Sequence, residues 1–400
     1  MAVQGKSTHH IEKPCANVLN IMSAHVIHGN SLNELPYLED CSVDAIVTDP
    51  PYELGFMNKK WDASGIAYNV NIWAHCLRVL KPGGHLLAFG GTRTYHRMAC
   101  AIEDAGFEVR DSINWIYGSG FPKSLDVSKA IDKAAGAERE IIGERKLGGN
   151  AAQSTQEKGG TYASNTNSVG VEPISVPITA PATDEAKQWE GWGTALKPAH
   201  EPIVLARKPF DDTVANNVMQ HGTGALNIDA TRIGEGGQGT WASPRGGIWK
   251  TDSEQKAELL SSTVGRWPAN VIIDDSIEAV WTPYFYCAKA AKSEKNAGLE
   301  GMPERRPDER TDVGMGTFVE KGVAKQSNFH PTVKPLELMK YLCRLITPPN
   351  GTILDPFAGS GSTLVAATLE GFNSIGIEMT ADYLPIIEAR IKWAESQIAP

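Results

Sequence analysis

A short strand, a glycine-rich turn and a helix follow one another near the end of the sequence, and this succession constrains the fold more than any other feature. Residues 351–363 read GTILDPFAGSGST and lead into a helical stretch that runs to Glu370. Glycines in such a turn let the backbone approach a ligand closely, and the N-terminus of the following helix points at that ligand. We therefore expect an α/β fold with a ligand at the carboxyl ends of its strands.

A second strand, residues 373–378, follows that helix and ends in Glu378. A carboxylate in this position can accept hydrogen bonds from both ribose hydroxyls of an adenosine group. The glycine turn alone is weak evidence, because Gly-Ser-Gly also serves as ordinary helix punctuation. The turn and the carboxylate together favour a cofactor that contains adenosine.

A buried-type strand, residues 43–48, runs directly into Asp49-Pro50-Pro51-Tyr52. A turn of this composition suits one reaction in particular, the methylation of an aromatic amine. This reaction is difficult because the nitrogen lone pair is delocalised into the ring, so a catalyst must accept the hydrogens of the amine. The Asp49 carboxylate and the Pro50 carbonyl can do this together in a turn that the prolines hold rigid. Tyr52 offers a flat ring on which an extruded base can stack. The alternative is an ordinary turn at a strand end, where Asp-Pro is common.

The remaining periodic segments alternate between strand and helix, which indicates a largely parallel sheet with covering helices. Residues 24–28 and 85–89 have the pattern of strands, and residues 72–80 that of an amphipathic helix, which the following Lys-Pro-Gly-Gly ends. Further strands are expected at residues 202–206 and 269–273. The block from about residue 329 to the end reads as helix, strand, turn, helix, strand and helix.

Composition excludes several classes of protein. Six cysteines without a C-x-x-C pair argue against a disulfide framework and a zinc site, and no metal is expected. No apolar run approaches the roughly 20 residues that span a bilayer, so we expect a cytoplasmic protein that does not contact membranes. The formal charge of −9 argues against a general nucleic-acid coat. It does not exclude an enzyme that concentrates its positive charge on one face.

Three segments in one order make the sequence similar to a known family. Residues 49–52, the HPTVKP segment at 330–335 and the turn at 355–361 together resemble the amino-methylating DNA methyltransferases of the β arrangement, in which the catalytic motif precedes the cofactor motifs. The resemblance implies a Rossmann-like α/β fold with a seven-stranded, mostly parallel sheet, and S-adenosylmethionine as cofactor. It covers about residues 24–125, 195–210 and 328–395.

The resemblance also implies roles for individual residues. The catalytic group is Asp49, Pro50, Pro51 and Tyr52. The cofactor would be bound by the glycine turn, the ribose-binding glutamate and the segment at the methionine end, together with a polar residue after the first strand: Asp355, Pro356, Phe357, Ala358, Gly359, Ser360, Gly361, Glu378, Thr332, Lys334 and Asn30. At the last of these positions similar enzymes usually carry an acid, so the role of Asn30 is left open.

Weaker signals concern the nucleic acid. Arg93 and Arg97 follow a strand at the expected ligand edge and are candidates, with Lys123, for DNA phosphates, although a solvated loop explains the two arginines as well. The aromatic segment 114–123 offers a lining for an extruded base, while Trp115 itself is expected in the core.

The composition changes along the chain predict its organisation. Gly, Ser, Thr, Asn and Gln dominate residues 147–168, which is typical of an insertion or a mobile loop. We expect a flexible tail at 1–20, the catalytic half of a methyltransferase domain at 21–125, an insertion or mobile loop at 126–190, a returning strand at 191–210, a target-recognition insertion at 211–327 and the cofactor-binding half at 328–398.

The sequence thus predicts a site-specific enzyme that methylates adenine N6 in double-stranded DNA by base flipping, because the aspartate form of the tetrapeptide is usual for adenine enzymes. A cytosine-N4 enzyme would use the same residues, and a catalytically silent DNA-binding subunit is a further alternative. An RNA or protein-glutamine methyltransferase normally carries its cofactor turn first in the chain, which disfavours that class. A cognate restriction endonuclease and a homodimer are left open as partners.

Overall fold

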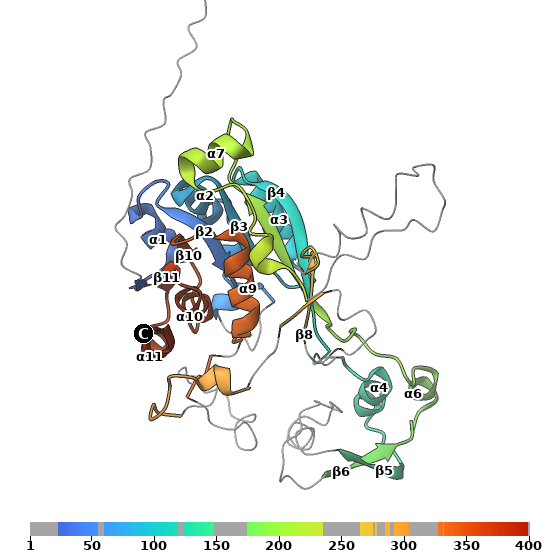
Figure 1. The fold of residues 1–400 in the computed structure, drawn as a ribbon. Coiled ribbons are helices and arrows are strands. Elements are labelled where there is room, and N and C mark those ends of the chain that lie inside the picture. Colours follow the sequence, from blue (N-terminus) through green and yellow to red (C-terminus); the bar gives the residue numbers. More distant parts are fainter. Residues whose placement is uncertain are drawn as a thin grey trace, which may run out of the picture.

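The computed structural model describes residues 23–54, 60–118, 120, 124–147, 174–234, 265–274, 277, 285–288, 292–304, 327–330 and 332–398. Its main body is a twisted sheet with helices on both faces (Figure 1). The strands of the sheet are β1 Ala24–His28, β2 Val43–Thr48, β3 Leu80–Phe89, β4 Glu108–Ile116, β7 His200–Arg207, β8 Val271–Asp274, β9 Tyr286–Ala288, β10 Thr352–Asp355 and β11 Asn373–Glu378.

The strand order is β1-β11-β10-β2-β3-β7-β4-β8-β9, and neighbouring strands are parallel except for β7, which is antiparallel to both β3 and β4. The expected α/β class with a mostly parallel sheet is confirmed. Within the described residues the sheet has nine strands where seven were expected. β8 coincides with the strand expected at 269–273, whereas β4 and β9 were not expected; β8 and β9 extend the edge beside β4.

Two helical layers bury opposite faces of this sheet. Alternate residues of β2 point to opposite sides: Ala45 and Val47 pack in one core, and Ile46 packs in the other. The helices of the body are α1 Ser31–Glu34, α2 Val70–Val79, α3 Tyr95–Asp104, α7 Val214–His221, α9 Leu336–Ile346, α10 Ser362–Leu369 and α11 Leu384–Ile398. The first core includes α9 and α10, and the second includes α2 and α3.

One predicted strand start is wrong. The helix ends at Val79, just before the Lys-Pro-Gly-Gly segment expected to end it, but residues 81–84 belong to β3, which begins at Leu80 instead of His85. Pro82 lacks a backbone N–H, and a register shift between Val43 and Ala45 of the neighbouring β2 accommodates this region of the ladder. The strands predicted at 24–28 and 43–48 are confirmed with the same bounds, and so is the element order of the final block.

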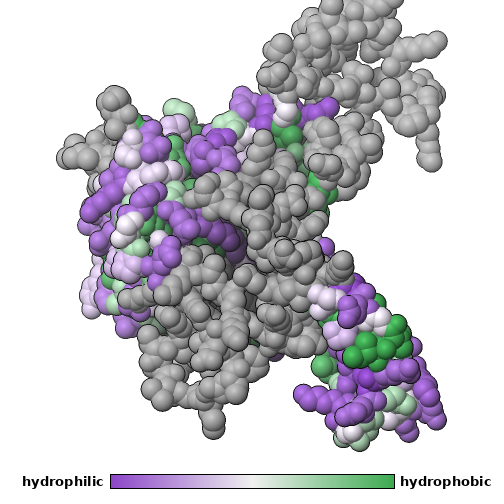
Figure 2. Space-filling view, turned by 90° about the horizontal axis from the view of Figure 1, so that it is seen from below, coloured by the Kyte–Doolittle hydropathy of each residue, from purple (hydrophilic) through white to green (hydrophobic). Residues whose placement is uncertain are grey.

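The segment 126–190 contains a small folded unit beside the main body. It consists of α4 Val127–Ala135, the antiparallel pair β5 Ile141–Leu147 and β6 Ile174–Thr179, and α6 Asp184–Gln188. Figure 2 shows its surface apart from that of the sheet, with hydrophobic side chains grouped on it. The loop expected at residues 147–168 lies, beyond Leu147, outside the described residues.

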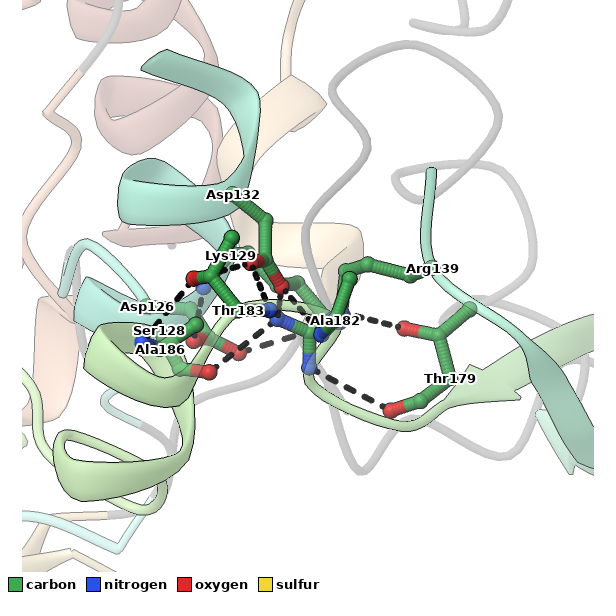
Figure 3. A network of polar contacts seen from close by, with 9 residues as sticks. All are labelled: Asp126, Ser128, Lys129, Asp132, Arg139, Thr179, Ala182, Thr183 and Ala186. Carbon is green, nitrogen blue, oxygen red and sulfur yellow. Dashed lines mark hydrogen bonds and ion pairs between the residues drawn. The ribbon is translucent and has the colours of Figure 1, made fainter. Parts of the chain in front are cut away.

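A buried carboxylate ties this unit together (Figure 3). Asp132 of α4 accepts hydrogen bonds from the backbone N–H groups of Ala182 and Thr183, both at 3.0 Å, and pairs with Arg139 at 2.7 Å. Arg139 also donates to the Thr179 hydroxyl at 3.1 Å. One charged pair thus joins α4 to the turn before α6 and to the end of β6. Among the described helices, none is long and apolar enough to cross a bilayer.

Candidate active site

The carboxyl ends of β1, β11, β10 and β2 meet at one edge of the sheet, and a cavity of about 710 Å³ opens there. A hydrogen bond of 2.7 Å from Thr48 Oγ1 to Asp355 Oδ1 joins the two strands whose turns line it. Most residues predicted for the site line this one cavity: Asn30, Asp49, Pro50, Pro51, Tyr52, Thr332, Lys334, Asp355, Pro356, Phe357, Ala358, Gly359, Ser360 and Glu378.

Asp49 directly follows β2, and its two carboxylate oxygens have different surroundings. Oδ2 accepts a hydrogen bond of 2.6 Å from the Lys334 ammonium. Oδ1 is buried and has no hydrogen-bond partner among the described residues. An unpaired buried acceptor is costly to maintain, and in native structures such atoms point to an absent ligand or a functional role. The Thr94 hydroxyl donates to the Tyr52 carbonyl at 2.8 Å, which anchors the other end of the tetrapeptide.

Lys334 lies at the centre of a charged cluster that includes a residue not predicted from the sequence. Its ammonium is 3.4 Å from the Glu201 carboxylate of β7 and 3.1 Å from the Tyr52 hydroxyl. The Tyr52 hydroxyl in turn donates to Glu201 at 2.8 Å. The sequence interpretation assigned Lys334 to the methionine end of a cofactor, whereas its ammonium here contacts the tetrapeptide. In the sequence, Glu201 is marked only by its place as a carboxylate directly before the apolar residues 202–206 of β7.

Burial and charge act in opposite directions within this cluster. Burial raises the pKa of Asp49, and the nearby Lys334 opposes that rise without cancelling it. Burial alone would lower the pKa of Lys334, but Asp49 and Glu201 outweigh it and the pKa is raised, so the ammonium stays charged. Burial, followed by the two carboxylates, raises the pKa of Tyr52 well above its usual value, and the side chain remains a neutral phenol.

The glycine turn between β10 and α10 forms the opposite wall. Gly359 has φ 55°, a left-handed conformation that favours glycine, and its N–H donates to Glu378 Oε2 at 2.8 Å. The other Glu378 oxygen accepts from the Thr380 N–H at 2.7 Å. Asp355 Oδ1 also accepts from the Phe357 N–H at 3.0 Å, and burial raises the pKa of Asp355 to about 6. Asp355 therefore braces the turn, while Glu378 links the turn to the end of β11.

A second residue that the sequence did not reveal supports the turn from behind. Arg390 of α11 is buried, and its Nη1 donates to the Ser360 carbonyl at 2.6 Å and to the Ser360 hydroxyl at 3.1 Å. Burial lowers the pKa of Arg390 to about 10, with Glu294 acting in the opposite direction. A buried guanidinium is costly unless it is hydrogen-bonded. The hydrogen bonds to Ser360 therefore explain why an arginine is buried here, against the glycine turn.

We expect Arg390→Ala to lower the free energy of unfolding by about 3 kcal/mol, because it leaves the buried Ser360 carbonyl without this donor and opens a cavity. Urea denaturation measures the change. Lys392→Ala, at an exposed position on the same helix, is the matched control and should shift stability by less than about 0.5 kcal/mol. Equal unfolding midpoints for the two variants would contradict the bracing role.

The remaining predicted residues lie around or away from the cavity. Gly361 does not line it, and Asn30 caps α1 by accepting from the Leu32 N–H at 3.0 Å. Arg93 and Arg97 are exposed beside the same sheet edge, without lining the cavity, and the Arg97 guanidinium lies 5.7 Å from the Tyr68 ring centroid. The predicted Lys123 lies outside the described residues.

The aromatic segment after β4 contributes rings to the cavity. Trp115 was expected in the core; it is only partly buried and lines the cavity with Tyr117, their ring centroids 5.1 Å apart. Trp115 Nε1 has no hydrogen-bond partner among the described residues. A wall of flat rings can bind a planar group.

Comparison with known proteins gives consistent matches. A family model described as DNA methylase matches residues 43–389. The type II methyltransferase M.HindIII of Haemophilus influenzae is 25% identical over 313 residues, which are 77% of this chain and 63% of that protein. The type II methyltransferase M.ScaI of Streptomyces caespitosus is 35% identical over 112 residues, which are 27% of this chain and 36% of that protein. The chain thus spans less than two thirds of the length of either relative.

Two solved structures align along most of the chain. The cytosine-N4-specific PvuII DNA methyltransferase has 14% sequence identity and a TM-score of 0.43, covering 92% of this chain and 87% of its own. The M1.HpyAVI-SAM complex has 17% identity and a TM-score of 0.40, covering 92% of this chain and 98% of its own.

Proposed function

The chain belongs to the N6/N4 DNA methylase family, and on that premise we propose that it transfers a methyl group from S-adenosylmethionine to adenine N6 in double-stranded DNA. The observation that carries the proposal is that Asp49 lines the same cavity as the glycine turn and has one carboxylate oxygen, the buried Oδ1, without a hydrogen-bond partner among the described residues. An acceptor of this kind suits the N–H of an exocyclic amine. We place the activity in the cytoplasm.

The residues of the cavity fit S-adenosylmethionine. Gly359 leaves room at the turn that a side chain would fill, since a Cβ there would lie 3.0 Å from His330 Nε2. Glu378 lines the cavity at the end of β11, and each of its carboxylate oxygens can accept a further hydrogen bond from a ribose hydroxyl. When bound, the cofactor supplies a methyl group on a positively charged sulfur, which is a good leaving group.

The side chains of the other wall act on the base. Tyr52, Trp115 and Tyr117 provide flat surfaces for a base that has left the duplex. Asp49 Oδ1 and the Pro50 carbonyl accept the two amine hydrogens, which orients the nitrogen lone pair toward the methyl group. As the N–C bond forms, the carbon–sulfur bond of the bound cofactor would break with its electron pair left on the sulfur, and Asp49 would take the proton that the newly methylated, positively charged nitrogen releases. The raised pKa of Asp49 suits that transfer. Arg93 and Arg97 lie where they can contact phosphates outside the cavity.

Adenine is preferred because the tetrapeptide begins with aspartate, as in the adenine enzymes that it resembles. Cytosine N4 is the second candidate, since its amine can make the same hydrogen bonds to Asp49. A catalytically silent DNA-binding subunit is disfavoured because Asp49, Gly359 and Glu378 are all present in one cavity. A restriction endonuclease partner and a homodimer belong to the proposal only as open alternatives.

We expect single-molecule sequencing of DNA from cells that express the protein to show N6-methyladenine in one sequence motif, and none with Asp49→Ala. The modified base and the recognition sequence then appear in the same experiment. N4-methylcytosine in the motif would replace the adenine assignment with the cytosine one. Unmodified DNA, from cells whose purified protein binds S-adenosylmethionine, would favour the silent subunit.

A further inference from the structure

Glu201 lies at the point where the catalytic tetrapeptide meets the segment before α9. It projects from β7 into the cavity that Asp49 and Lys334 also line. Its carboxylate accepts from the Tyr52 hydroxyl at 2.8 Å and lies 3.4 Å from the Lys334 ammonium. A strand thus presents a carboxylate both to Lys334, which pairs with Asp49, and to Tyr52 of the same tetrapeptide.

The charges of this cluster do not balance. Asp49 and Glu201 are two carboxylates around the single ammonium of Lys334, and each is close enough to pair with it. In a poorly solvated site an ammonium bound to one carboxylate alone largely neutralises that carboxylate as an acceptor. A second carboxylate on the same ammonium divides this attraction and leaves the cluster with a net negative charge.

We propose that Glu201 is a positioning residue that shares the Lys334 ammonium with Asp49 and thereby keeps the Asp49 carboxylate a strongly basic acceptor for the target amine. This inference rests on the proposed function. Glu201 also fixes the Tyr52 hydroxyl, so that the ring is held at a constant angle beside Asp49. It has no direct contact with the amine in this account and acts through Lys334 and Tyr52.

Several elements present titratable groups to this cluster. Lys334 comes from the segment before α9 and Tyr52 from the turn after β2. The outer groups are Tyr117 after β4, Asp274 at the end of β8 and Asp355 at the end of β10, with His200 and His330 along the cavity wall. Because Asp49, Tyr52 and Lys334 interact strongly, the measurable quantity is the apparent pKa of the Asp49 carboxyl within the cluster.

Glu201→Gln tests the proposal, since the amide can still accept from Tyr52 but carries no charge. Removing the nearby negative charge lowers the apparent pKa of Asp49, because Glu201 contributes to raising it. ¹³C NMR of carboxyl-labelled aspartates, with Asp49→Asn as the assignment variant, measures this decrease. We also expect the single-turnover methylation rate on a duplex with the sequenced motif to fall roughly tenfold at high pH, because a weaker base is a poorer acceptor.

The direction of the pH dependence follows because Asp49 is active as the ionised carboxylate. Methyl transfer is present above the apparent pKa of Asp49 and is lost as the pH falls through it, so the acid limb of the rate profile moves to lower pH in Glu201→Gln. Glu201→Asp retains the charge and should restore the acid limb toward its original position. Glu108→Gln is the matched control. It removes a carboxylate of β4 that pairs, outside the cavity, with Arg207 at the other end of β7, the strand that carries Glu201. It should change neither the apparent pKa of Asp49 nor the methylation rate.

Two results would overturn the inference. A rate loss without a change in the Asp49 titration would show that Glu201 acts on structure alone. A shifted titration with an unchanged rate would show that sharing the ammonium has no catalytic consequence. A wild-type protein that binds S-adenosylmethionine but methylates no DNA would refute the proposed function instead, and the NMR titration would still decide whether Glu201 sets the charge of Asp49.

Discussion

Alanine in place of Asp49 is expected to lower the single-turnover rate of methyl transfer by about 10²- to 10³-fold, because removing one preorganised group at a reacting centre typically costs that much. The change removes Oδ1, the acceptor without a partner, and Oδ2, which holds Lys334. The glycine turn is on the opposite wall and keeps its hydrogen bond to Glu378. The dissociation constant for S-adenosylmethionine should therefore change by less than about threefold.

The Asp49 prediction needs rapid-quench measurements with labelled cofactor and a calorimetric titration of the cofactor alone. Asp40→Ala is a suitable control, because Asp40 is an exposed carboxylate shortly before the start of the same strand β2, and its rate should equal that of the wild type. An Asp49→Ala protein that retains more than about a tenth of the rate would refute the acceptor role. Simultaneous loss of cofactor binding would mean that the two walls of the cavity are not independent.

The parts of the fold that could be predicted are those with strong local signals. Strands β1 and β2 are continuous apolar or alternating runs, and the final block combines buried strands with a glycine turn. By contrast, β9 is three residues long, and it is held by pairing with β8 and by the stacking of Tyr286 on Tyr341. The start of β3 was missed because its Pro and Gly residues indicate a helix end locally, whereas the pairing with β2 decides its conformation.

The candidate site divides in the same way. The tetrapeptide and the glycine turn are contiguous motifs, so each could be found without knowing what lies beside it. Glu201 and Arg390 are single charged residues within a strand and a helix, and their partners are Lys334 and Ser360, which are distant in the sequence. The antiparallel β7 begins at the edge where the parallel strands end, which brings Glu201 to Lys334, and the packing of α11 behind the glycine turn brings Arg390 to Ser360.

Gly361→Ala is expected to reduce both cofactor affinity and stability, although Gly361 does not line the cavity. Its φ is 76°, and an added Cβ would lie 2.8 Å from Ile387 Cγ2. Ile387 is fully buried against Ala358 and Leu364, so it cannot move away without displacing the turn. We expect the free energy of unfolding to fall by about 3 kcal/mol, from backbone strain and overpacking together. Affinity for S-adenosylmethionine should fall at least about tenfold, because the turn that carries Gly359 shifts.

Gly222→Ala separates the two causes, because Gly222 has φ 75° and open space where the Cβ would be. It follows α7, away from the cavity, and should lose only about 1 kcal/mol from backbone strain, with unchanged cofactor affinity. Urea denaturation and calorimetric titration of both variants give the comparison. Equal stability losses would mean that Ile387 relaxes freely and that contact with α11 does not fix the turn. The excess loss in Gly361→Ala therefore measures how firmly α11 holds the cofactor turn in place.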